Sequence, residues 1–447
     1  MFPPFPQELA HHYCINLISR LEKGSSQLCQ ISRESEERKN QGVMIGTLVC
    51  YDKTQNRRTV LYAVSGNGKI LKLNKDNDDY LSEIVVPSLV SPEKITEALS
   101  QYDKEIHILT DKINNLEKGE ERNFLIKKRT ELTDISLQKV FDLYNFTRFD
   151  KKNISLNYII KKHNGRLPPT GTGDCCAPKL LSYAFENDLQ PVSMDEVYYG
   201  KNTKTKINGQ SYNPCDDRCG YILPYILGVE ILYRDKDIIV VNKESGLLSV
   251  PGKGPDKQDC VEYRIKKLFP ETINQPAVHR LDMETSGILV LALNKASHRL
   301  MNRQFAEGIV HKKYIALLDG ILHGKQEGRI ELKTRVDINN RPYQIIDNEN
   351  GKLGITDWKK TGVVNYVNSK NGEITKATKI EFTPITGRTH QLRVAASSEY
   401  GLNIPIIGDS LYGTKKNGQR LMLHAYYIEF LQPVTNKKII IKTGCPF

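Results

Sequence analysis

The sequence predicts an α+β protein, from its length and from the order in which strand and helix patterns follow one another. Its 447 residues suggest about two to four domains, each large enough for its own core. From residue 228 to residue 447, short strand-like runs outnumber helical ones. The connections between them leave little room for regular βαβ crossovers, so we expect this region to be one α+β domain.

Local patterns assign several elements of residues 228–447. VEILYRDKDIIVVNK is typical of two strands around a charged turn, and ILVLAL and KYIALLDG each indicate a further strand. KASHRLMNRQFAEG is predicted to be helical, because Leu300, Met301 and Phe305 recur on one face. TKATKIEFTPITGRTHQLRVAASS is expected to run from a strand through a glycine turn into a helix.

Residues 1–90 are predicted to form a small α/β segment. A helical pattern over residues 8–21 precedes two β-rich runs, GVMIGTLVCYD and RRTVLYAVSG, which the polar DKTQN connects as a hairpin. SGNGK is not a phosphate-binding loop, because Ala63 stands where its first glycine belongs and Ile70 where Ser or Thr must follow.

Residues 91–148 are predicted to form an antiparallel, coiled-coil-like helical hairpin. Pro92 suits a first helical turn. Apolar residues then alternate at spacings of four and three, with charges between them, at Ile95, Leu99, Tyr102, Ile106, Leu109, Ile113 and Leu116. Gly119 separates this seam from a rougher one through Leu125, Leu132 and Val140. The break argues against a parallel dimer, so a monomer is expected.

Residues 149–227 are predicted to be an irregular connecting region with four cysteines. Cys175 and Cys176 are adjacent, and Cys215 and Cys219 follow further along. Neither pair has the Cys-x2-Cys spacing common in zinc sites, so buried free thiols are the favoured interpretation and structural zinc is the alternative. The nine cysteines of the chain, an odd number thinly spread, fit a reducing cytoplasm better than a disulfide framework.

The composition favours a polyanionic partner. Lys and Arg number 64 against 52 Asp and Glu, which gives a net charge of +12 and favours nucleic acid, with a generally basic soluble protein as the alternative. No apolar run reaches the roughly 18 residues of a membrane span. MFPPFPQELAHHY lacks the basic and apolar regions of a signal peptide, so we expect a cytoplasmic protein without a membrane partner.

The segment HRLDMETSG places Arg280 and Asp282 directly before the apolar strand ILVLAL. A surface ion pair at a strand end is the simplest interpretation, and such pairs are common. A kinase catalytic loop is excluded, because Leu281 separates Arg280 from Asp282 and the chain has no Asp-Phe-Gly and no glycine-rich phosphate loop.

Three motifs follow downstream. HKKYIALLDG presents Tyr314 at the start of a strand. TGRTHQLR places Arg388, His390 and Arg393 at a turn into a helix, where an anion or carboxylate can be held. PIIGDSLYG adds Asp409. A carboxylate, a ring able to stack and several arginines indicate carboxylate chemistry on a base held in a basic groove.

In this order, HRLDMETSG, HKKYIALLDG, PITGRTHQLR and PIIGDSLYG resemble the RluA family of pseudouridine synthases. ILYRDKDIIVVNKESGLLSVPG matches the family's opening strands and departs at Glu244, where a proline usually follows the lysine. The resemblance covers residues 228–447 and implies a mixed, mainly antiparallel sheet with a central active-site cleft. Residues 1–227 lie outside it and do not resemble the small S4 RNA-binding module of many members.

The resemblance implies isomerisation of specific uridines in rRNA or tRNA. The N1–C1′ bond is broken, the base turns and a C5–C1′ bond forms, without a metal or other cofactor. Asp282 is implied as the catalytic aspartate, which attacks the sugar or the base or removes a proton from C2′. Tyr314 is implied to stack on the uracil and supply a hydroxyl, and Arg388 to pair with Asp282 and hold it ionised.

The remaining residues of the motifs are implied to bind the flipped nucleotide. Arg280 would fill the space that the base leaves in the stack. Leu392 would line the apolar side of the pocket, and His279, His390 and Arg393 would contact the RNA or the base.

The same residues allow two other functions, both disfavoured. A non-catalytic RNA-binding or ribosome-assembly protein that keeps the fold is disfavoured, because such a protein has no need of Asp282, Tyr314 and Arg388 together. A nucleoside hydrolase would need a second carboxylate. Asp409 is the only nearby candidate, and its loop is expected to support the fold.

Overall fold

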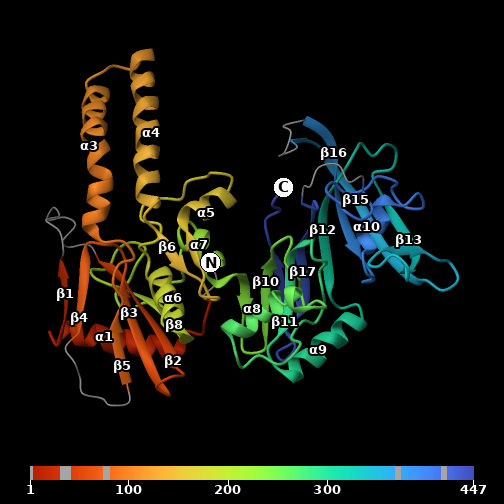
Figure 1. Cartoon of the computed structure of the whole chain (residues 1–447), viewed down its shortest axis with the longest axis horizontal. Coiled ribbons are helices and arrows are strands. Elements are labelled where there is room, and N and C mark those ends of the chain that lie inside the picture. Colours follow the sequence, from red (N-terminus) through yellow and green to blue (C-terminus); the bar gives the residue numbers. More distant parts are fainter. Residues whose placement is uncertain (1–3, 31–41, 74–80, 368–373, 414–419) are drawn as a thin grey trace. The chain divides into compact units, whose positions relative to one another are not determined.

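The computed structural model describes residues 4–30, 42–73, 81–367, 374–413 and 420–447 (Figure 1). The chain divides into two compact units, with the boundary between Gly228 and Val229. In the described part of the chain, no helix combines the length and the apolar character needed to cross a membrane.

The first unit is built on a four-stranded sheet in the order β5-β3-β2-β8. The hairpin expected from the sequence is present as β2 (Val43–Asp52) and β3 (Arg57–Val64). β5 (Leu81–Val85) runs parallel to β3, and β8 (Leu189–Tyr199) runs antiparallel to β2. The expected first helix is α1 (Glu8–Glu22), whose buried face packs on this sheet. A separate ladder joins β1 (Ser26–Gln30) to β4 (Lys69–Leu73).

The prediction that residues 149–227 are irregular is wrong. They form β7, α5, α6, β8 and α7, at Asn153–Ser155, Leu156–Lys162, Cys176–Glu186, Leu189–Tyr199 and Cys219–Leu227. β7 pairs with β6 (Asn145–Thr147). β8 pairs with β2 from Val43↔Tyr199 to Asp52↔Leu189, so residues 149–227 complete the sheet that residues 1–90 begin. Local patterns cannot reveal a strand pairing between segments this far apart in the chain.

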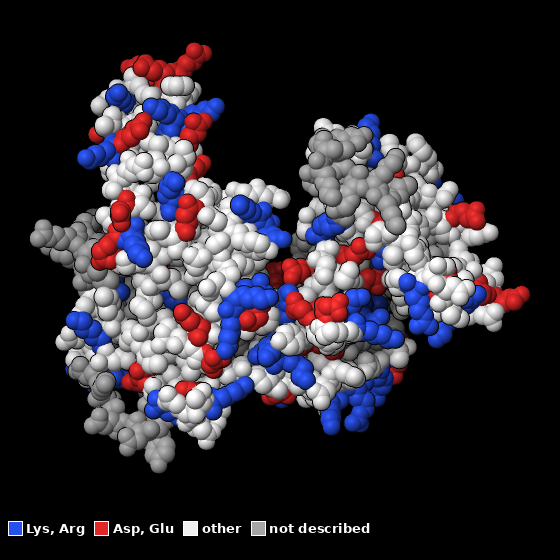
Figure 2. Space-filling model, viewed as in Figure 1, with Lys and Arg blue, Asp and Glu red and all other residues white. Residues whose placement is uncertain are grey.

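The helical hairpin is observed as α3 (Pro92–Asn114) and α4 (Glu120–Phe141), which lie side by side (Figure 1). Ser91 caps α3 by accepting a hydrogen bond from the N–H of Lys94 at 3.4 Å, and Gly119 is the N-cap of α4. Within the predicted seam, Leu109 and Ile113 are buried. Figure 2 shows Lys and Arg interspersed with Asp and Glu along the hairpin, so it presents no single-sign surface in this view.

The second unit holds a ten-stranded sheet in the order β14-β13-β15-β16-β12-β17-β11-β10-β9, with β18 paired to β17. Among the strand pairs that the structure describes here, only β11 and β17 run parallel, so the predicted mixed, mainly antiparallel α+β domain is confirmed. The strands are Glu230–Arg234, Ile238–Lys243, Ser286–Ala292, His311–Leu318, Glu327–Val336, Gln344–Ile346, Lys352–Val367, Ile374–Pro384, Leu423–Leu431 and Lys438–Lys442, for β9 to β18.

Three α-helices and a short 3-10 helix accompany the described strands of the second unit. The α-helices are α8 (Val261–Leu268), α9 (Lys295–Ala306) and α10 (Gln391–Ser397), and the 3-10 turn η1 is Pro255–Lys257. The predicted helix is α9, which packs its buried Met301 on the sheet beneath β11. Every residue of β11 is buried, so this strand is a rigid platform for the loop that enters it.

The position of Gly287, at the start of β11, has no room for a side chain. Here β11 begins its parallel pairing with β17, and Gly287 lies opposite Ala425. Gly287 has a φ of +119°, and a Cβ at this position would fall 2.3 Å from the carbonyl oxygen of Ala425. Any side chain would push the two strands apart, and with them the loop that carries Asp282.

Candidate active site

A cleft of ≈ 530 Å³ opens in the second unit beside the first residues of β11. Its walls come from the loop before β11, the end of α9, the start of β12 and the turn before α10. All the residues that the sequence predicted for the site line this cleft, namely Asp282, Tyr314, Arg388, Arg280, His279, Leu392, His390 and Arg393. Segments far apart in the sequence therefore meet in one place.

The loop that carries Asp282 is held by hydrogen bonds on both sides of the carboxylate. The hydroxyl of Ser249 donates to the carbonyl oxygen of Leu281 at 2.7 Å and accepts from the N–H of the same residue at 3.0 Å. The N–H of Gly246 donates to the carbonyl oxygen of Met283 at 2.8 Å. The backbone is thus fixed immediately before and after Asp282, which limits the positions its side chain can reach.

The buried side chain of Lys243, the last residue of β10, also holds this loop by hydrogen bonds. Its ammonium donates to the carbonyl oxygens of Glu244, Leu247 and Met283 at 2.9, 2.6 and 2.9 Å. Burial lowers the pKa of Lys243 to about 7, while the charge of Asp282 acts in the opposite direction. Three carbonyl acceptors match the three donors of an ammonium group, so the geometry favours the charged form.

The expected pairing of Arg388 with Asp282 is wrong. The Nε of Arg388 donates to the carbonyl oxygen of Leu353 at 2.9 Å, and the side chain is exposed. Arg393 takes the expected place, with its Nη1 3.9 Å from Oδ2 of Asp282. This distance exceeds a hydrogen bond but allows strong electrostatic attraction, because the Arg393 side chain is only 2% exposed.

Arg393 is itself fixed by two further carboxylates. Its Nε and Nη2 bind Asp409 in a bidentate pair at 2.9 and 2.6 Å, and Nη2 also donates to Glu284 at 3.1 Å. Burial acts to raise the pKa of Asp409, but the hydrogen bonds and the charge of Arg393 outweigh it and lower the pKa overall. Asp409 therefore orients the guanidinium, as expected for a loop that supports the fold.

His390 lies on the other side of Asp282. Its Nε2 is 4.0 Å from Oδ1 of Asp282, and its Nδ1 shares a hydrogen bond with the hydroxyl of Tyr412 at 2.8 Å. Burial lowers the pKa of His390, although the charge of Asp282 opposes this shift. At 4.0 Å the two groups make no direct hydrogen bond, and the lowered pKa favours the uncharged imidazole.

Tyr314 presents a buried ring and a protonated hydroxyl to the cleft. The register of β12 against β17 shifts between Lys313 and Tyr314, and a bulge of this kind redirects a side chain from the regular alternation. Burial raises the pKa of Tyr314 far above its usual range, and the charge of Asp282 raises it further. Within the described residues its hydroxyl makes no hydrogen bond, so it can donate to a bound molecule.

Arg280 and Leu392 occupy positions consistent with binding a ligand. The side chain of Arg280 is exposed at the cleft and has neither a hydrogen bond nor an ion pair to any residue that the structure describes. Leu392 is buried and adds apolar surface to the wall. Their contact with RNA stays a prediction.

His279 is largely engaged in holding the fold. Its Nε2 accepts a hydrogen bond from the N–H of Val290 in β11 at 3.1 Å, and its ring packs on Phe305, with the ring centroids 4.9 Å apart. Burial lowers the pKa of His279 to about 3, so the ring is uncharged at neutral pH. A charged contact with phosphate is therefore not available to this side chain.

Two kinds of residue at the site were not predicted from the sequence. Lys312 lines the cleft, and burial lowers the pKa of its ammonium group. The signal was present in HKKY, but periodicity does not tell which of two adjacent lysines faces inward. Glu284 and Tyr412 hold Arg393 and His390 from outside the cleft, and single residues that position others carry no motif of their own.

Comparison with known proteins finds relatives of the second unit. The sequence model of the RNA pseudouridylate synthase family matches residues 237–398. A protein of Yersinia pestis named dual-specificity RNA pseudouridine synthase RluA is 42% identical over 206 residues, which cover 45% of this chain and 92% of that protein. The protein of the same name from Escherichia coli (strain K12) is 37% identical over 242 residues, covering 53% and 99%.

A solved structure, the human RNA pseudouridylate synthase domain containing 1, is 31% identical, covers 49% of this chain and 84% of its own, and has a TM-score of 0.40. The curated relatives are matched over almost their whole length by about half of this chain. The family model falls within the second unit, where the cleft lies. Through this unit the chain belongs to the RluA family of RNA pseudouridine synthases.

Proposed function

We propose that the cleft of the second unit isomerises uridine in RNA to pseudouridine, with Asp282 as the catalytic carboxylate. Asp282 is the only carboxylate among the described residues that line the cleft, and its side chain is 28% exposed there. This single observation carries the proposal. It also disfavours a nucleoside hydrolase, which needs two carboxylates across one pocket.

The neighbours of Asp282 suit a reaction that requires it ionised. Attack on the sugar, attack on the base and removal of the C2′ proton all use a carboxylate rather than a carboxylic acid. Arg393 supplies the compensating cation, and its own ion pair with Asp409 keeps it from swinging away. In a site shielded from water, such a fixed charge needs no rearrangement during the reaction.

The cleft also provides for a base taken out of its stack. Extruding a base costs a few kcal/mol, and enzymes offset this cost with stacking and with side chains that enter the vacated space. The ring of Tyr314 lines the cleft and can stack on a base. The exposed guanidinium of Arg280 also lines the cleft and can enter the vacated space. Arg388, exposed beside the same opening, is proposed to contact the RNA backbone rather than Asp282.

The RNA substrate is proposed from the relatives. Those matched in Yersinia pestis and Escherichia coli are named dual-specificity RNA pseudouridine synthases. We propose that this chain modifies uridines of rRNA or tRNA, in keeping with its net charge of +12.

Tritium release tests the proposed reaction. The full chain is incubated with rRNA and tRNA transcribed in vitro and labelled with tritium at C5 of uridine. Formation of the C5–C1′ bond displaces the C5 hydrogen, so tritium should appear in the solvent and pseudouridine at defined positions. RNA that binds tightly but loses no tritium would instead indicate a binding protein that retains the fold.

Substitutions of Tyr314 should separate its ring from its hydroxyl. Tyr314→Phe keeps the ring and is expected to bind substrate RNA about as well as the wild type, with slower turnover because the donor is lost. Tyr314→Ala should weaken binding by roughly 1–3 kcal/mol, the usual value of one base–aromatic stack. Fluorescence anisotropy with labelled RNA measures both. Equal affinities for the two variants would show that the ring does not touch the base, provided that both keep the wild-type circular dichroism.

A further inference from the structure

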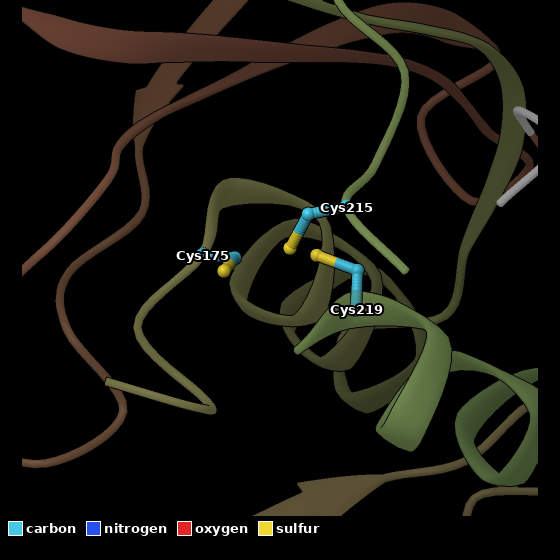
Figure 3. A group of neighbouring side chains, drawn as sticks. All are labelled: Cys175, Cys215 and Cys219. Atoms are coloured by element: carbon cyan, nitrogen blue, oxygen red, sulfur yellow. The ribbon is translucent and has the colours of Figure 1, made fainter. Parts of the chain in front are cut away.

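Three cysteines of the first unit converge, although Cys175 lies far from Cys215 and Cys219 in the sequence (Figure 3). Cys175 is the N-cap of α6, Cys219 is the first residue of α7, and Cys215 lies in the loop before α7. Their sulfur atoms all lie within 4.8 Å of one another, and in Figure 3 the side chains of Cys215 and Cys219 turn toward each other beside Cys175. The cluster lies outside the active-site cleft and plays no part in the proposed reaction.

Cys176, the neighbour of Cys175, is not part of this cluster. Its Sγ lies 3.4 Å from the carbonyl oxygen of Met44 and 3.5 Å from that of Ala63, within the β-sheet of the same unit. The four cysteines that the sequence offered as a possible zinc set therefore divide into three convergent thiols and one that packs on the sheet. This division supplies an internal control.

The backbone on either side holds the three thiols in place. Gly173 has a φ of +104°, and a Cβ there would fall 2.5 Å from the ring of Tyr144, so the chain passes this ring only because the residue is glycine. The hydroxyl of Tyr144 donates to Asp174 at 2.6 Å, which fixes the residue before Cys175. The N–H of Gly220 donates to the carbonyl oxygen of Cys215 at 3.0 Å and closes the turn between the other two cysteines.

The separation of the sulfur atoms suits a tetrahedral metal ion. Zinc binds thiolate sulfur at about 2.3 Å, which places two sulfur ligands of a tetrahedron about 3.8 Å apart. The observed limit of 4.8 Å needs only small rotations of the side chains to reach this value. Cys175 and Cys219 stand at the starts of helices of 11 and 9 residues, so the backbone of each helix fixes the position of its cysteine.

We propose that Cys175, Cys215 and Cys219 bind one Zn²⁺ and leave its fourth coordination position to an exchangeable ligand. Among the described residues, no fourth His, Cys, Asp or Glu joins the group within the same distance. Cys215 is exposed, so a water molecule or a small ligand can reach the metal from solvent. Zinc sites with four protein ligands are structural, whereas sites with three keep an open position.

The placement of the ligands is similar to that in zinc-dependent nucleobase deaminases. Those enzymes take one ligand from a His-x-Glu segment, whose glutamate is catalytic, and two from a Pro-Cys-x2-Cys segment further on. Here Pro214-Cys215 is followed by Cys219, with one residue more between the cysteines. Ala177 stands where their catalytic glutamate would be, and Glu196 of β8 accepts a hydrogen bond from the N–H of Ala177 at 2.9 Å. This chain therefore offers the metal ligands without that glutamate, and the proposal is limited to metal binding.

Metal content of the full chain tests the ligand set. The protein is purified with a phosphine reductant, loaded with Zn²⁺, separated from free metal and analysed by mass spectrometry of the elements. The wild type and Cys176→Ala should each hold about one Zn²⁺ per chain, the content of a single tetrahedral site. Cys215→Ser should bind Zn²⁺ more weakly by at least about tenfold, since even loss of a second-shell partner costs about 10- to 100-fold. Cys215 is exposed, so this substitution disturbs the packing least.

Protection from alkylation gives a readout that needs no variant. Bound Zn²⁺ should slow modification of Cys175, Cys215 and Cys219 and leave Cys29 of the same unit unaffected, as read by peptide mass spectrometry. Equal Zn²⁺ affinity of the wild type and Cys215→Ser would overturn the proposal. A disulfide within the cluster that persists in the reductant would overturn it as well.

Cobalt tests the open fourth position. Co²⁺ bound to three thiolates should give intense sulfur-to-cobalt charge-transfer absorption and the visible bands of a tetrahedral ion. Imidazole added to the Co²⁺ protein should shift the visible bands if the fourth ligand exchanges. A tetrahedral spectrum that imidazole leaves unchanged would overturn the open position and point to a fourth protein ligand.

Discussion

An Asp282→Asn variant is expected to release tritium from C5-labelled RNA at least about a thousandfold more slowly than the wild type. Loss of an essential catalytic group slows enzymes on this scale. The amide has the size and shape of the carboxylate but carries no negative charge. It can therefore neither attack the sugar or the base nor accept the C2′ proton. The backbone around Asp282 is held by Ser249, Gly246 and Lys243, so the loop should keep its conformation.

Glu284→Gln is the matched control for Asp282→Asn. Glu284 lies two residues further along the same loop and also contacts Arg393, at 3.1 Å, but it does not line the cleft. Both substitutions remove one negative charge near Arg393, so a general electrostatic effect would appear in both. We expect Glu284→Gln to keep most of its turnover and Asp282→Asn to keep its affinity for RNA. Turnover by Asp282→Asn close to that of Glu284→Gln would remove Asp282 from the mechanism.

The place of the loop that carries Asp282 could be predicted because its motif is contained in one short segment. Arg280 and Asp282 are two residues apart and directly precede β11, so a linear motif is enough to find them. Tyr314 likewise stands in its motif at the start of a strand. In each case the residue and the element that positions it are neighbours in the sequence.

The choice between Arg388 and Arg393 could not be made in this way. Both belong to TGRTHQLR, and the direction each side chain takes depends on His390, which adopts the left-handed conformation at φ 53° and starts α10. With this change of backbone direction at His390, the side chain of Arg393 is buried and that of Arg388 is exposed. The partners that hold Arg393, Glu284 and Asp409, come from two distant loops, so the pattern around TGRTHQLR gave no sign of them.

In the first unit, too, local patterns predict local elements but not contacts between distant segments. The helical hairpin could be predicted because a heptad pattern is local. The pairing of β8 with β2 joins segments separated by the whole hairpin. Cys175 likewise meets Cys215 and Cys219 because α6 packs against α7, although β8 lies between them in the sequence. The spacing within each pair of cysteines did not predict a metal site, because one of the three ligands precedes β8 in the sequence and the other two follow it.

Replacing Arg393 by Met should have the largest effect on stability of the changes considered, a loss of about 3–5 kcal/mol, because it leaves a buried charge without its partner. Met matches much of the length of Arg393 but cannot pair with Asp409, which is as deeply buried as the guanidinium. The chain has one tryptophan, Trp358 of β15, so its fluorescence reports the unfolding of the second unit in urea without a contribution from the first.

A double substitution separates the stabilising part of Arg393 from its action on Asp282. In Arg393→Met with Asp409→Asn the buried charge is gone, and the Asn oxygen can still accept from the N–H groups of Leu411 and Tyr412, which lie 2.9 and 3.0 Å from Oδ1 of Asp409. Much of the lost stability should therefore return. Turnover should stay as low as in Arg393→Met, because Asp282 still lacks the cation 3.9 Å away. If turnover recovers together with stability, Arg393 serves only the fold, and the electrostatic part of the proposed mechanism is wrong.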